Sequence, residues 1–158
     1  MTNMRRGFTM IELIFVIVII GILAAVAIPK LAATRDDADS AVCVREVGHL
    51  ISEITAYYTK VGNSKFQATN VSEMTNITVD SSTTRGIRAD AAVHDTGVTY
   101  YCDGKSIVTV KGSVDSNSST NYTLTVSTST GGTPASNIAI ETIKENILDG
   151  GTSKAFKL

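Results

Sequence analysis

The sequence has no tryptophan, only two prolines and only two cysteines in 158 residues. Its charges nearly cancel, with 14 Lys and Arg residues against 15 Asp and Glu residues. Nucleic-acid-binding domains carry a basic stripe, often with interleaved aromatic residues, and none follows Lys30. We therefore expect no nucleic-acid partner. The chain that remains after its one long apolar run is sufficient for a single small domain.

Motifs that carry catalysis or bind metals are also missing. His49 and His94 have no suitably spaced partner, and the sequence contains no H-x-x-x-H, C-x-x-C or G-x-S-x-G pattern. Asp36, Asp37 and Asp39 lie in a predicted helix, where side chains at these spacings point in different directions, whereas a calcium site needs converging oxygens. We therefore expect no enzyme activity, no cofactor and no metal site.

What the sequence does contain is an apolar run from Phe8 to Ile28 with one carboxylate, Glu12, near its start. About 20 apolar residues are enough for a helix to cross the hydrocarbon core of a membrane. A charged side chain at membrane depth costs roughly 2.5–3.5 kcal/mol on insertion scales, so Glu12 needs a partner or a function. Cleavage after Gly7 would create such a partner, the free amino group of Phe8.

The stretch RRGFTMIELIFVIVIIGILAAVAIPK, from Arg5 to Lys30, resembles the N-terminal segment of type IV pilins and of the pseudopilins of type II secretion systems. The resemblance implies that a prepilin peptidase cleaves after Gly7 and that the new N-terminus, Phe8, is N-methylated. It also implies that Glu12 supports the assembly of a filament. The chain is then a structural subunit rather than an enzyme.

The resemblance further implies a leader at 1–7, a transmembrane and assembly helix at 8–29 and a globular domain at 30–158. The expected partners are the inner membrane, the prepilin peptidase, identical or related subunits and the pilus or secretion assembly machinery. The basic pair before Gly7 favours a cytoplasmic N-terminus, so the subunit would start as a single-pass inner-membrane protein. It would end in a periplasmic pseudopilus or a cell-surface pilus.

The sequence does not separate a pilus from a secretion pseudopilus. Some major pilins have a disulfide in the C-terminal tail, but here neither cysteine lies there. Some pseudopilins have a calcium loop near the C-terminus, but the segment after Asp149 has too few acidic residues for one. Both forms of filament therefore stay open.

The same residues allow two other interpretations. Arg5 and Arg6 could begin a secretory signal peptide, with Leu13 to Leu23 as its apolar region and cleavage after Ala27. The product would then be an exported soluble binding domain. A plain single-span anchor without polymerisation is the third possibility. Because the apolar run begins before the supposed signal core and the helical pattern continues past the supposed cleavage site, the pilin-like interpretation is favoured.

After Pro29, apolar residues recur at alternating steps of four and three, which places them on one face of a helix. These residues are Cys43, Val47, Leu50, Ile54, Tyr57 and Val61. We expect one helix from Phe8 to Val61, with polar residues such as Glu46 and Glu53 facing solvent. Gly21 and Pro29 are its weak points, and the resemblance implies that the helix melts locally between them in the filament.

The rest of the chain predicts a small antiparallel sheet, because apolar and polar residues alternate in segments next to turn residues. The predicted strands are 98–102, 107–111 and 122–127, with a possible short strand at 77–79 and a polar loop at 112–121. Thr133 and Pro134 predict the start of a C-terminal helix that closes at Gly150. The expected fold is α+β, a long N-terminal helix packed on three to four strands, with a short C-terminal helix.

Cys43 lies on the apolar stripe of the helix, and Cys102 lies on the same strand face as Val98 and Tyr100. Since the domain is placed outside the cytoplasm, we predict a disulfide between them, with two buried free thiols as the alternative. Such a bond would be worth about 4 kcal/mol in the chain-entropy model.

One modification site is a further candidate. Asn117 is followed by the required serine, and Asp115 precedes it by two residues, which resembles the acceptor pattern of some bacterial glycosylation systems. Because it lies in the predicted polar loop, we expect its side chain to be accessible.

Overall fold

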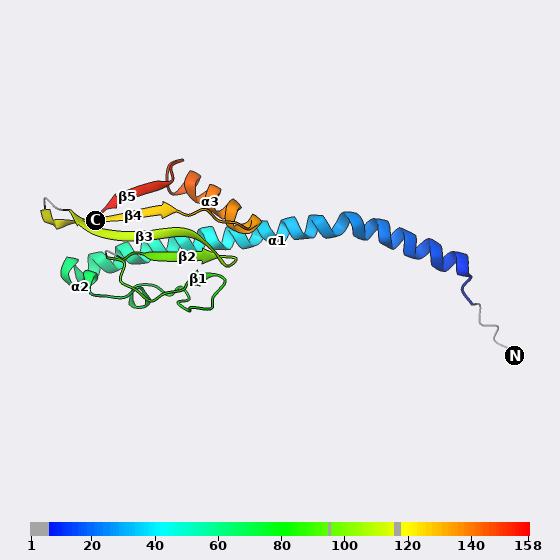
Figure 1. Cartoon of the computed structure of the whole chain (residues 1–158), viewed down its shortest axis with the longest axis horizontal. Helices are drawn as coiled ribbons and strands as arrows, with labels where there is room; N and C mark the ends of the chain where they lie inside the picture. The colour runs from blue at the N-terminus through cyan, green and yellow to red at the C-terminus, as the bar shows by residue number, and fades with distance from the viewer. Residues whose placement is uncertain (1–6, 95, 116–117) are drawn as a thin grey trace. The chain divides into compact units, whose positions relative to one another are not determined.

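The computed structural model describes residues 7–94, 96–115 and 118–158. The chain divides into two compact units, Met1–Arg35 and Asp36–Leu158. The first unit contains the N-terminal part of helix α1 (Met10–Val61), and the second contains the rest of α1 with the sheet and the shorter helices (Figure 1). The fold is α+β, as predicted.

Helix α1 begins at Met10, two residues later than predicted, because Phe8 and Thr9 form its N-terminal cap region. It continues through Pro29 and ends at Val61. Gly62 adopts the left-handed conformation (φ +75°) that commonly closes a helix, and its N–H donates to the carbonyl of Tyr58 at 2.9 Å. The chain then turns into the short helix α2 (Asn63–Gln67).

The sheet has five antiparallel strands in the order of the chain, one more than the largest number predicted. They are β1 (Gly86–Ile87), β2 (Val98–Cys102), β3 (Lys105–Asp115), β4 (Ser118–Thr128) and β5 (Ser153–Lys157). The β2–β3 hairpin has the predicted turn, in which Asp103 and Gly104 both have positive φ. The first additional strand, β1, pairs Ile87 with Tyr100.

Three details of the predicted sheet were wrong. Residues 112–115 and 118–121 are strand rather than loop, because backbone pairing continues through polar residues, for example Ser113 with Thr123. Residues 77–79 do not form a strand, and only Val79 makes an isolated bridge with Ile87. Strand β5 was not predicted, since its sequence SKAFK is short and mostly polar.

The core of the second unit lies between α1, the sheet and helix α3 (Pro134–Asn146). Alternate strand residues face it, including Tyr100, Val110 and Leu124, all with no exposed surface. The predicted start of α3 is confirmed, because the Thr133 side chain accepts from the Ser136 N–H and Pro134 occupies the first turn. The helix ends at Asn146, four residues before Gly150.

Side-chain contacts organise the segment between α1 and β2, for which the sequence predicts little. The Phe66 ring is buried and packs edge-on against Tyr58 and Tyr122, with ring centres 5.3 and 5.1 Å apart. The Asp90 carboxylate accepts from the N–H and hydroxyl of Ser72, at 3.0 and 2.8 Å, and so caps the 3-10 turn Val71–Glu73. These contacts fix residues 66–90 without a long regular element.

Candidate functional site

The start of α1 is closed by a reciprocal cap between Thr9 and Glu12. The N–H and hydroxyl of Thr9 donate to Glu12 Oε2 at 2.8 and 2.7 Å, and the Glu12 N–H points back to Thr9 Oγ1 at 3.4 Å. This is a capping box, which satisfies amide groups that the first helical turn leaves unpaired. Glu12 therefore has a role within its own chain that the sequence analysis missed, although the T-x-x-E spacing is the signal for it.

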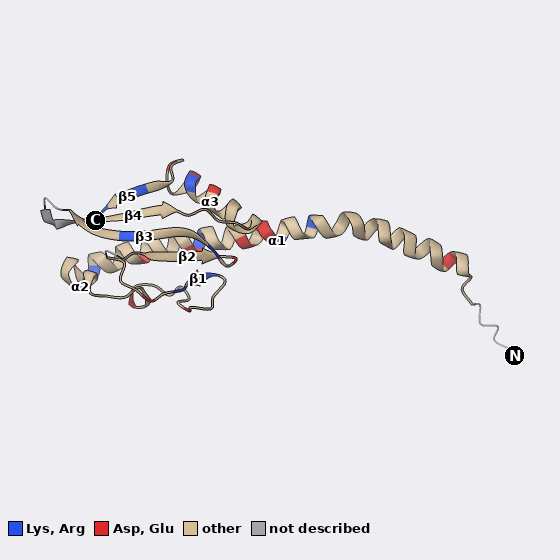
Figure 2. Ribbon diagram, in the orientation of Figure 1, with Lys and Arg blue, Asp and Glu red and all other residues tan. Residues whose placement is uncertain are grey.

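The apolar side chains of the first unit are exposed, from Phe8 at 86% to Leu31 at 68%. In Figure 2 the N-terminal part of α1 has very few charged residues. This helix is long and apolar enough to cross a membrane, and none of its most apolar stretch is buried within the structure. Gly21 has open space around its Cα, so it offers room for a close neighbour.

The predicted residues of the first unit are therefore placed along one helix and its cap. Phe8 and Glu12 lie at its N-terminal end, and Gly21 and Pro29 lie within it. Gly7 precedes the cap and is exposed. Glu12 contacts Thr9, and the apolar stretch that follows forms a continuous exposed surface.

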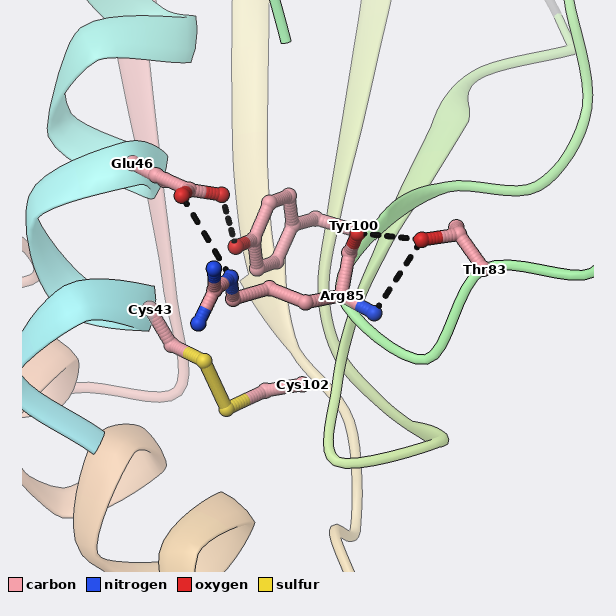
Figure 3. Close-up of polar contacts among 6 residues, drawn as sticks. All are labelled: Cys43, Glu46, Thr83, Arg85, Tyr100 and Cys102. Carbon is pink, nitrogen blue, oxygen red and sulfur yellow. Dashed lines mark hydrogen bonds and ion pairs between the residues drawn. A yellow bond between two sulfur atoms is a disulfide. The ribbon is translucent and has the colours of Figure 1, made fainter. Parts of the chain in front are cut away.

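In the second unit, Cys43 and Cys102 form the predicted disulfide (Figure 3). Both residues are buried, so the bond lies inside the core between α1 and β2. Because 59 residues separate the two cysteines, the chain-entropy model assigns the bond about 4 kcal/mol. The bond fixes α1 to the sheet at the first apolar core residue that the helix contributes.

One turn further along α1, Glu46 holds two partners (Figure 3). The hydroxyl of the fully buried Tyr100 donates to Glu46 Oε2 at 2.6 Å, and Arg85 Nε lies 3.5 Å from Glu46 Oε1. Burial raises the pKa of Tyr100, and the hydrogen bond to the Glu46 carboxylate raises it further. Figure 3 also shows Thr83 bonded to the backbone of Arg85.

Two turns beyond Glu46, Glu53 binds the loop that follows the 3-10 turn. Its carboxylate accepts from the Thr75 hydroxyl, and from the backbone and side-chain nitrogens of Asn76 at 3.3 and 3.2 Å. Partial burial acts to raise the pKa of Glu53, but these hydrogen bonds outweigh it and hold the pKa below its ordinary value. The expectation that Glu46 and Glu53 only face solvent was wrong. Glu46 ties α1 to Arg85 and Tyr100, and Glu53 ties it to Thr75 and Asn76.

The sequence analysis also considered a glycosylation site at Asn117 and a calcium loop after Asp149. Asn117 lies outside the described residues. Asp149 pairs with Lys154, with Oδ2 and Nζ 2.7 Å apart. Across 7–94, 96–115 and 118–158, no three His, Cys, Asp or Glu side chains come together as a metal site would require.

Comparison with known proteins bears mainly on the N-terminal part of the chain. Residues 2–28 match the model of the prokaryotic N-terminal methylation motif. The predicted resemblance is confirmed to that extent, on the same residues that carry the Thr9–Glu12 cap and the exposed apolar stretch.

Several curated proteins are similar to part of the chain. The type II secretion system core protein G of Dickeya chrysanthemi is 36% identical over 69 residues, which are 44% of each chain. Its counterpart in Klebsiella michiganensis is 40% identical over 65 residues, 41% of this chain and 44% of the relative. Fimbrial protein Q of Moraxella bovis is 48% identical over 54 residues, 34% of this chain and 32% of the relative.

The chain thus spans less than half the length of the curated relatives that it matches. The range that the family model matches, 2–28, lies within the first unit. No solved structure matches the chain.

Proposed function

We propose that this protein is a structural subunit of a type II secretion pseudopilus or of a related type IV pilus-like filament, and not an enzyme. One observation supports this above all: the methylation motif coincides with a helix whose apolar side chains are exposed. Exposed apolar surface of this size needs lipid or other apolar helices to cover it. A membrane covers it before assembly, and neighbouring subunits cover it in the filament.

The proposed maturation follows the motif. A prepilin peptidase removes residues 1–7, and the new N-terminus, Phe8, is N-methylated. Segment 8–29 then holds the subunit in the inner membrane with its N-terminus on the cytoplasmic side, and domain 30–158 lies in the periplasm. The assembly machinery transfers the subunit into a filament of identical or related subunits.

In this proposal Glu12 serves two partners at once. Its Oε2 is engaged by Thr9, while Oε1 accepts no hydrogen bond within the described residues. The methylated ammonium of Phe8 on a neighbouring subunit can therefore bind Oε1 without opening the cap. Pairing with that ammonium offsets the cost of an unpaired charge in an apolar surrounding and fixes the axial register of the two subunits.

Mass analysis of the N-terminus of the processed protein tests the proposal. We expect the mature chain to begin at Phe8 with one added methyl group. A mature chain that begins at Ile28 would support the exported binding domain instead. A chain that retains residues 1–7 in the membrane would support the plain anchor.

A further inference from the structure

The part of α1 that lies in the second unit has an exposed face opposite its buried one. Small and positively charged residues make up this face, and a hollow of about 330 Å³ lies on it, lined by Arg45, Gly48, His49 and Ser52. A second hollow of about 260 Å³ shares Arg45 and His49 and extends to residues 76–78. A Cβ added at Gly48 would meet no neighbouring atom, so the first hollow is shallow and open to solvent.

The charges around the hollow favour an anion. The nearby carboxylates are already engaged, since Glu46 binds Tyr100 and Arg85 and Glu53 binds Thr75 and Asn76. What remains at the rim is the exposed guanidinium of Arg45, the imidazole of His49 and the hydroxyl of Ser52. A guanidinium beside a hydroxyl is suited to binding a carboxylate.

The same helix also carries an exposed carboxylate closer to its N-terminus. Asp37 is exposed and lies eight residues before Arg45, which is about 12 Å along the helix and about 80° around it. At that distance Asp37 cannot reach Arg45 of its own chain. Between the two residues Ala41 is exposed, and Gly48 and Ser52 follow on the same side, so a second helix can approach closely.

We propose that Asp37 of one subunit inserts into the hollow formed by Arg45, Gly48, His49 and Ser52 of the next subunit. This inference rests on the proposed function, because the subunits of one filament would carry this part of α1 side by side and in the same direction. An axial shift of about 12 Å between parallel helices then brings the two charges together. The contact uses a different patch on each subunit and leaves a free Asp37 at one end and a free hollow at the other, so it propagates as a filament.

A charge swap tests the contact in full-length protein, expressed together with a pilus or type II secretion assembly machinery. We expect Asp37→Arg and Arg45→Asp each to lower the yield of sheared filaments by roughly fivefold or more, and the double variant to restore it. The matched control is the pair Lys157→Asp and Glu145→Arg, two exposed residues on β5 and α3, which should leave the yield unchanged. Wild-type yield in both single variants, or no recovery in the double variant, would overturn the contact.

A second measurement keeps the test independent of folding. Ser52 is exposed, and a photo-cross-linking phenylalanine analogue in its place should react with residues 36–41 of another copy, as identified by mass spectrometry of mixed heavy and light chains. Cross-links between copies that all fall elsewhere would overturn the inference while filaments still form. A wild-type chain that yields no filament would instead reject the proposed function.

Discussion

The two units of this protein treat apolar residues in opposite ways. In the first, side chains from Phe8 to Leu31 are 42% exposed or more wherever they are large and apolar, whereas in the second the large apolar side chains are mostly buried between α1, α3 and the sheet. A single helix supplies both surfaces. The second part of the helix is stabilised by contacts within its own chain. The first part needs an apolar environment, which a membrane or other subunits can provide.

The largest expected effect comes from the one acid in the first unit. We expect Glu12→Val to insert into the membrane normally but to lose most filament assembly, because the variant removes both the cap and the proposed partner of the Phe8 ammonium. Sheared-filament yield, with membrane fractionation as the check on insertion, measures this. An undiminished filament yield in the valine variant would show that assembly does not need Glu12.

Glu12→Gln is the matched control, because glutamine can still close a capping box but carries no charge. If the charge is what assembly requires, this variant should fail as the valine variant does. If it assembles normally, the cap alone explains the residue. The comparison therefore separates the capping role that the structure shows from the charge pairing that we propose.

The next largest effect concerns the bond that holds α1 to the sheet. We expect Cys43→Ala combined with Cys102→Ala to lower the free energy of unfolding of the second unit by about 4 kcal/mol. Denaturant titration of the full-length chain in detergent measures it. Wild-type protein treated with a dithiol reductant should show a similar loss, and no response to the reductant would mean that the thiols are free.

A smaller loss is expected when the buried hydroxyl beside the disulfide is removed. Tyr100→Phe leaves the Glu46 carboxylate with one partner fewer and should cost roughly 1–2 kcal/mol at neutral pH. In the wild type the pKa of Tyr100 is higher in the folded than in the unfolded state, so stability should fall above pH 10.0, the ordinary pKa of a tyrosine. The phenylalanine variant should lose that alkaline decline, and an unchanged decline would assign it to another group.

The smallest effect is expected at Glu53. Its pKa is lower in the folded state, so its contribution is present at neutral pH and is lost as the pH falls below the ordinary value of 4.5. We expect Glu53→Gln to cost less than about 1 kcal/mol at pH 7 and to flatten the acid side of the stability curve. Thermal melting between pH 3 and pH 7 tests this, and identical curves for variant and wild type would contradict it.

Local patterns predicted the parts of the fold that local chemistry determines. The apolar stripe of α1, the turn at Asp103 and Gly104 and the Thr133 cap of α3 all depend on neighbours a few residues away. Sequence reasoning also places the disulfide, because both cysteines fall on predicted apolar faces. The Thr9–Glu12 cap belongs to the same group, since its spacing alone would have predicted it.

Other features depend on distant residues and leave no local signal. Glu46 and Glu53 look like any solvent-facing acids of an amphipathic helix, yet their partners lie 22 to 54 residues further along the chain. Strand β5 forms because β4 offers an unpaired edge, as in the pairing of Phe156 with Leu124. Polar residues of the β3–β4 hairpin also pair through their backbone groups. The alternation of apolar and polar side chains gives no sign of this pairing.

The order of the sheet has a consequence for how the chain folds. Strands β1 to β5 stand side by side in the order in which they are synthesised, so each one finds its neighbour already in place. If the N-terminal part of the chain becomes free first, for example as it leaves a translocation channel, the sheet can form one strand at a time. It need not wait for the last residues of the chain. Contacts between consecutive strands also keep the loops that must close short, which favours rapid folding.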